Sequence, residues 1–239
     1  MTLKELTFSA WYIPSINQVY YEQKFLEKYR DRAINDIAYD PLLGWDYNLS
    51  TNRIRPPALP ALQAVPNKRR ILIIGDSFAH GNEVSDTEVF SYLLEQKIEN
   101  VEVFTMGVGG YGVGQSTIKY LEYGRNYKPD LVIFAVHPPD FIRTALSFFS
   151  FSKPLLKVDN SVPEGYRTEN SPVPSPQKEL ARIESGNFWK SRLYYLIVSR
   201  IAQIPVFRKT LIETYLAKTS AQVRKAIDLV KSDVESRGG

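Results

Sequence analysis

Between residues 71 and 136 the chain alternates short apolar runs with stretches in which apolar positions recur at helical spacing. The run at 71–75 is short, β-branched and uninterrupted, which is typical of a strand covered on both faces, and further strands are predicted at 101–105 and 131–136. The stretches between them, about 87–99 and 115–126, predict amphipathic helices. Alternating strands and helices favour right-handed crossovers. The pattern therefore predicts an α/β fold, a three-layer α/β/α domain around a flavodoxin-like parallel sheet.

The first of these helices has a start signal of its own. Asp86-Thr87-Glu88 supplies capping side chains just ahead of it. The face expected to be buried consists of Phe90, Leu93, Leu94 and Ile98. Before the sheet, residues 16–38 predict an amphipathic helix that packs on the main domain, and 41–66 form a proline-rich connector anchored by Trp45. We therefore divide the chain into an N-terminal region, 1–67, and an α/β domain, 68–239.

The periodicity fails after the third strand. Residues 137–180 read as an irregular loop over the carboxyl edge of the sheet, a candidate lid or substrate wall. Two helices are predicted to follow, at about 189–203 and 206–232. The second has an apolar side made of Leu211, Ile212, Tyr215, Leu216, Val223, Ile227 and Val230. Because a helix in an α/β repeat normally leads into another strand, we expect the last strands of the sheet to be missing from this chain, as in a fragment or a truncated form.

Composition narrows the classes of protein. The 239 residues are 44% apolar and 23% charged, with a net charge of +4, as in an ordinary globular domain. No basic run exceeds Lys68-Arg69-Arg70, which we interpret as a solvated lead-in to a strand, so nucleic-acid binding is not expected. There is no cysteine, no metal-ligand spacing, no visible signal peptide and no apolar segment of membrane-spanning length. The default location is the cytoplasm, and the alternative, if the N-terminus is incomplete, is a secreted or membrane-anchored protein. No cofactor is expected, and the oligomeric state stays open.

Ser77 is the strongest candidate for chemistry. It follows the apolar strand 71–75 directly, after Gly75, which permits a sharp turn, and Asp76, which can bind nearby backbone. In open α/β sheets ligands bind just beyond the carboxyl ends of the strands. The pattern therefore predicts that Ser77 stands at a binding edge, although a Gly-Asp-Ser turn alone can also be purely structural.

Gly75-Asp76-Ser77-Phe78 resembles the first sequence block of the SGNH/GDSL hydrolases. The resemblance continues in order and spacing over about residues 40–145, and more loosely in the C-terminal helices. It includes Gly81-Asn82-Glu83-Val84-Ser85-Asp86, the glycine-rich run 107–114 and Tyr127-Lys128-Pro129-Asp130-Leu131-Val132. It implies the SGNH hydrolase fold and ester or thioester hydrolysis with Ser77 as nucleophile, the backbone N–H groups of Ser77 and Gly107 holding the oxyanion.

The glycine loop has a second interpretation. Gly107, Gly109 and Gly112 also satisfy the dinucleotide fingerprint G-x-G-x-x-G. That fingerprint should end the first strand, with an acidic residue closing the next one. Here the glycines follow the second strand, and the next strand ends in Val136-His137-Pro138. A phosphate- or nucleotide-binding domain is therefore the weaker reading.

The chain departs from the SGNH/GDSL pattern at two places. Where the third block has an oxyanion asparagine followed by aspartate, this chain has Pro139-Asp140, and proline has no donor. The fourth block, Asp-x-x-His, is absent, so the resemblance implies a base outside these residues. His80 and His137 are expected at the same rim, either as substitute bases or as residues that only shape the pocket.

The resemblance thus implies a hydrolase of carboxylic esters, with an acyl ester of a small molecule, glycan or lipid as substrate. As it stands, this chain is expected to be inactive or weakly active. The alternative is a non-catalytic SGNH-like module that binds a ligand or a partner protein through the same edge. Pro139 and the absent histidine block motivate that alternative.

Overall fold

The computed structural model describes residues 14–29, 38–47, 53–55, 60–63, 65–185, 193, 197, 200 and 204–239. Its centre is a parallel sheet in the order β4-β3-β5. The three strands are β3 Arg69–Gly75, β4 Val101–Thr105 and β5 Leu131–Ala135. The predicted α/β class and parallel sheet are thereby confirmed, and the strand bounds agree within two residues. Because the chain passes from β3 to β4 on one side and then to β5 on the other, the strand order reverses between β3 and β5.

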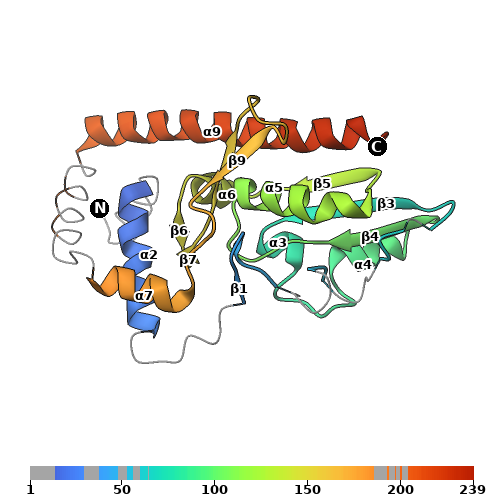
Figure 1. Ribbon diagram of the computed structural model, residues 1–239, viewed down its shortest axis with the longest axis horizontal. Helices are drawn as coiled ribbons and strands as arrows, with labels where there is room; N and C mark the ends of the chain where they lie inside the picture. The colour runs from blue at the N-terminus through green and yellow to red at the C-terminus, as the bar shows by residue number, and fades with distance from the viewer. Residues whose placement is uncertain are drawn as a thin grey trace.

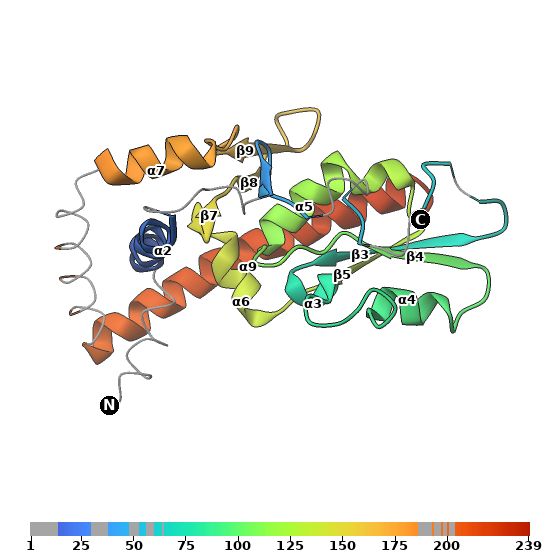
Figure 2. The same cartoon turned by 90° about the horizontal axis from the view of Figure 1, so that it is seen from below.

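Helices cover both faces of the sheet (Figures 1 and 2). On one face lie α3 Ser77–His80 and α4 Phe90–Glu95. On the other lie α5 Val113–Glu122 and α9 Pro205–Ser236. Side chains alternate accordingly. Ile71 and Ile73 of β3 pack toward the first face, while Leu72 and Ile74 pack toward the second.

The expected burial of the first helix is wrong. Phe90, Leu93 and Ile98 are 41%, 45% and 42% exposed, and only Leu94 packs against the core beneath the helix. The helix begins at Phe90 rather than near residue 87, and its N-cap residue, Val89, makes no side-chain capping bond. A helix of six residues makes fewer than two turns, so it offers the sheet only a short face and the apolar residues on its outer side stay exposed.

The helices on the second face agree better with expectation. The helix predicted at 115–126 is α5, continued by a 3-10 turn at Gly124–Tyr127. The last helix is α9, with Val223 and Val230 buried as predicted, whereas Ile227 is 37% exposed. The helix predicted at 189–203 lies outside the described residues, apart from three positions.

The segment expected to be irregular, 137–180, has secondary structure. It begins with α6 Pro138–Thr144 and ends in α7 Pro176–Ser185. Between them are two antiparallel hairpins, β6 Phe148–Phe149 with β7 Phe151–Ser152, and β8 Leu155–Val158 with β9 Tyr166–Glu169. Strands of two to four residues are too short to show a period in the sequence.

The N-terminal helix is α2 Pro14–Tyr29, and residues 30–37 of its predicted range lie outside the described residues. It packs on the β6–β7 hairpin, where the Phe25 ring lies 5.7 Å from those of both Phe148 and Phe151. Figures 1 and 2 show α2 and α7 together at the end of the molecule to which the carboxyl ends of the strands point.

The connector begins with a short hairpin, β1 Tyr39–Asp40 and β2 Gly44–Trp45. Trp45 anchors it as predicted, because the indole is buried and its Nε1 donates to the carbonyl of Gly109 at 3.0 Å. None of the described helices is both long and apolar enough to cross a membrane.

Candidate functional site

Ser77 stands where β3 gives way to α3, at the point where the strand order reverses. The turn needs Gly75, whose φ is +154° and whose Cβ, if present, would lie 2.4 Å from the carbonyl oxygen of Ala135. Asp76 caps α3 by accepting the N–H of Phe78 at 2.9 Å. The Ser77 side chain is partly exposed, and its hydroxyl makes no hydrogen bond to any residue that the structure describes. The predicted position of Ser77 is thus observed, and its hydroxyl is available to a ligand.

Beside Ser77 a buried carboxyl pair links the ends of β3 and β5. Nη1 of Arg143 lies 3.0 Å from Oδ2 of Asp76 and 2.9 Å from Oδ1 of Asp140. Oδ2 of Asp140 accepts the backbone N–H of His137 at 2.9 Å. Burial, together with the neighbouring Asp76 carboxylate and a hydrogen bond to it, raises the pKa of Asp140 well above its usual range. Asp140 therefore keeps its proton to a higher pH than an isolated aspartic acid would.

A buried lysine lies behind this pair. Nζ of Lys153 donates to the backbone carbonyl of Arg143 at 2.6 Å, and the residue is 1% exposed. Burial and the nearby Arg143 guanidinium lower the pKa of Lys153 to about 7. The sequence analysis missed Asp140 as a charged partner, and it missed Arg143 and Lys153 altogether, because the segment that holds them was read as irregular.

His80 is held away from base chemistry. Its Nδ1 lies 2.9 Å from Nη1 of Arg55, which can only donate, so this nitrogen is an acceptor. Asn82 also hydrogen-bonds to its side chain. Burial and the Arg55 charge lower the pKa of His80 to about 4, so the ring is neutral at physiological pH. To serve Ser77 as a base, His80 would first have to leave these partners.

His137 closes β5 on the opposite side of the strand-order reversal from Ser77. Its ring stacks on Phe78, with ring centroids 4.9 Å apart at 28°. Phe78 is 67% exposed, so this pair forms part of the rim. Nδ1 of His137 is buried and has no hydrogen-bond partner among the described residues. The structure thus brings Ser77 and His137 to one rim, as predicted, and shows no hydrogen bond between them.

Gly107 has a packing role that the sequence did not reveal. Its N–H donates to Oγ1 of Thr105 at 3.1 Å, and that hydroxyl donates to the carbonyl of Ala79 at 2.9 Å. A Cβ at Gly107 would lie 2.4 Å from the backbone nitrogen of His80. The turn after β4 therefore presses directly on α3. The proposed role of the Gly107 N–H in holding an oxyanion remains a prediction, and it requires this N–H to leave Thr105.

The start of α5, where a dinucleotide phosphate would bind, is covered by α6. The N–H of Val113 donates to Oγ1 of Thr144 at 2.9 Å. A Cβ at Gly112 would lie 2.6 Å from the backbone nitrogen of Thr144, so α6 packs tightly there. This arrangement weakens the nucleotide-binding reading. Within the described residues there is also no group of three or more His, Asp or Glu that could hold a metal ion.

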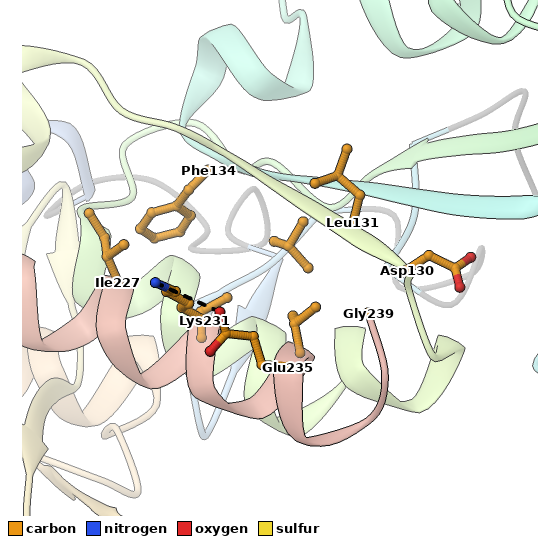
Figure 3. A pocket seen from close by; sticks show the side chains of 10 residues that line it. Asp130, Leu131, Phe134, Ile227, Lys231, Glu235 and Gly239 are labelled. Carbon is orange, nitrogen blue, oxygen red and sulfur yellow. Dashed lines mark ion pairs between the residues drawn. The ribbon is translucent and has the colours of Figure 1, made fainter.

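A separate hollow of about 250 Å³ lies between β5 and α9, toward the amino end of the strand (Figure 3). Its walls are largely apolar and include the Lys231–Glu235 ion pair of α9, at 3.7 Å. The hollow is lined by Asp130, Leu131, Val132, Phe134, Ile227, Val230, Lys231, Val234, Glu235 and Gly239. It includes none of the residues around Ser77, and it is therefore not part of the candidate site.

Comparison of the chain with protein-family models, with curated proteins and with solved structures finds no significant match. The class that the structure defines is an α/β protein with a parallel three-stranded sheet and a serine just beyond the carboxyl end of the central strand. The resemblance to the SGNH/GDSL hydrolases rests on the residues quoted above.

Proposed function

We propose that this chain is a serine hydrolase of carboxylic esters, of the SGNH/GDSL type, with Ser77 as its nucleophile. The observation that carries the proposal is the position of Ser77 at the carboxyl end of the central strand, with its hydroxyl free of described partners. Ligands of open α/β sheets bind at this edge, where the strand order reverses. The resemblance in the residues around Ser77 supplies the reaction class.

In the proposed reaction the oxygen of Ser77 bonds to the acyl carbon while its proton passes to a base. The carbonyl electron pair moves onto the acyl oxygen and then returns as the bond to the alcohol breaks, and the alcohol leaves with the proton. Water repeats the sequence on the acyl-serine and releases the acid. No described side chain contacts the Ser77 hydroxyl as a base, so this chain should react slowly unless a base is supplied.

The experiment measures covalent labelling of Ser77 by a fluorophosphonate, with mass spectrometry of the modified peptide. We expect slow labelling that free imidazole accelerates, because imidazole can take the serine proton. Ser77→Ala should abolish the labelling, and Ser161→Ala, at an exposed serine that bonds Asp159, should leave it unchanged. Labelling that persists in Ser77→Ala, or no Ser77 adduct with or without imidazole, would refute the proposal.

A non-catalytic SGNH-like binding module is the second candidate. It is favoured by the engagement of His80 with Arg55 and by Pro139, which offers no donor. The labelling experiment separates the two, since a binding module needs no reactive serine. Specific binding of an acyl ester without any Ser77 adduct would favour the module.

A further inference from the structure

Only one nitrogen of the Arg143 guanidinium, Nη1, donates hydrogen bonds to described residues. Its Nη1 contacts Asp76 and Asp140 at 3.0 and 2.9 Å, and the carbonyl of Tyr111 at 3.4 Å. Its Nε and Nη2 groups donate to no residue in the described part of the chain. The side chain is 18% exposed, and neither donor is among the buried described atoms that lack a partner, so both are open to solvent. Both donors are therefore available to a ligand.

Arg143 reaches the position where a donor is lacking. It lies four residues after Pro139 in α6, on the same face of the helix. Helical side chains lean toward the N-terminus, so the side chain of Arg143 extends back over the turn that contains Pro139. Its bonds to Asp140 and Asp76 agree with that direction, and Asp76 is the residue next to Ser77. The guanidinium therefore lies at the start of α6, close to the proposed nucleophile.

Packing holds Arg143 in place before any ligand arrives. The guanidinium carbon lies 5.0 Å from the centre of the Phe149 ring, within cation–π range. Its backbone carbonyl is bound by Lys153, and its Cβ lies against Gly112, where an added Cβ would come within 3.0 Å. A donor that is ordered beforehand stabilises developing charge without further reorganisation. The raised pKa of Asp140 strengthens the attraction of Arg143 for an anion, because a protonated Asp140 leaves more of the Arg143 charge uncompensated.

We propose that Arg143 is the anion-binding residue of this site and donates through Nε and Nη2 to the acyl oxygen of the substrate and to the carboxylate of the acid product. The proposal rests on the proposed function for the identity of its ligand. In this role the Arg143 guanidinium supplies the hydrogen-bond donor that Pro139 cannot provide. A charge-assisted pair of hydrogen bonds from one guanidinium is also the geometry that carboxylates prefer.

The test uses acetate, the simplest carboxylate product, and follows the ¹⁵Nε–H resonance of Arg143 by NMR at constant ionic strength. Saturable movement of this resonance is expected in the wild type and in Ser77→Ala, because binding does not need the nucleophile. Arg143→Gln should weaken acetate binding at least about 10-fold, the effect of losing a charged hydrogen bond. Arg167→Gln, which removes an exposed arginine paired with Asp159, should leave acetate binding unchanged.

Thermal melts establish whether Arg143→Gln is folded. If Arg143→Gln is not folded, the Nε–H resonance that disappears in Arg143→Lys is assigned to Arg143. The acetate titration of the wild-type protein then tests the proposal. An Arg143 resonance that does not move at several hundred millimolar acetate, or acetate binding that survives in folded Arg143→Gln, overturns the proposal. A Ser77 adduct without acetate binding would refute the role of Arg143 alone. Acetate binding at Arg143 without any Ser77 adduct would refute the hydrolase and keep Arg143 as a ligand-binding residue.

Discussion

Gly107→Ala tests whether close packing of the turn after β4 against α3 holds that helix, and with it Ser77, in position. The new Cβ would lie 2.4 Å from the nitrogen of His80 and 2.7 Å from the carbonyl carbon of Ala79. Both are backbone atoms, so no side chain can rotate away to make room. Alanine keeps the backbone N–H, and any effect therefore comes from the added methyl group rather than from a lost donor.

The size of the effect follows from these contacts. Forcing a methyl group into close packing costs about 1–3 kcal/mol, and the upper end applies where backbone must move. Separation of α3 from β4 would also weaken the hydrogen bond from Thr105 to the Ala79 carbonyl, worth about 1 kcal/mol. We expect the free energy of unfolding to fall by about 3–4 kcal/mol, equivalent to a loss of roughly 6–15 °C in Tm.

Urea unfolding and thermal melts measure this loss, with Gly114→Ala as the matched control. Gly114 lies in α5, and its nearest neighbour would be the side chain of Leu156 at 3.3 Å. The gain in helix propensity, about 1 kcal/mol, should offset that contact and leave stability within about 1 kcal/mol of wild type. If Gly107→Ala is equally mild, the turn does not seat α3, and the packing argument for this glycine is wrong.

Three further predictions concern charged and titratable groups. His80 has a lowered pKa of about 4, so below pH 6.5 the unfolded chain binds more protons than the folded chain. The free energy of unfolding should therefore fall by up to about 3 kcal/mol from pH 6.5 to pH 4. Urea unfolding of His80→Asn should show no such fall. Asp140 has a raised pKa, so its stabilising contribution is fully present below the unfolded-state pKa of about 3.9 and is lost as the pH rises through the folded-state pKa. Asp140→Asn should remove this fall in Tm between the two pKa values, and an unchanged slope there would contradict the assignment. Arg70 is fully buried and donates to Glu102 and to backbone carbonyls. Arg70→Met should therefore lower the free energy of urea unfolding by about 3–5 kcal/mol, whereas Arg69→Met, at an exposed arginine, should change it by less than about 0.5 kcal/mol. Equal effects of the two substitutions would show that the buried hydrogen-bond network of Arg70 contributes little to stability.

The strands were predictable because their signal is local. Residues 71–75 and 131–136 are short apolar runs, and 101–105 is a short run rich in valine, so each indicates a strand whatever its neighbours are. The depth of burial was not local, because β5 is only partly buried and its Leu131 is 50% exposed. The face of α4 was not predictable in the same way. Whether Phe90 and Leu93 are buried depends on how much sheet lies under a six-residue helix, and that depends on distant strands.

For the candidate site, the sequence by itself determined that a serine follows the central strand, because Gly75-Asp76-Ser77 directly continues an apolar run. Only the tertiary structure decided what surrounds it. Asp76 and Arg143 are 67 residues apart in the chain, and they meet because parallel strands end at one edge of the sheet. The same packing turned His80 toward Arg55 and left Nε and Nη2 of Arg143 without a partner among the described residues. Such contacts depend on how separate elements pack, a property that no local pattern of residues encodes.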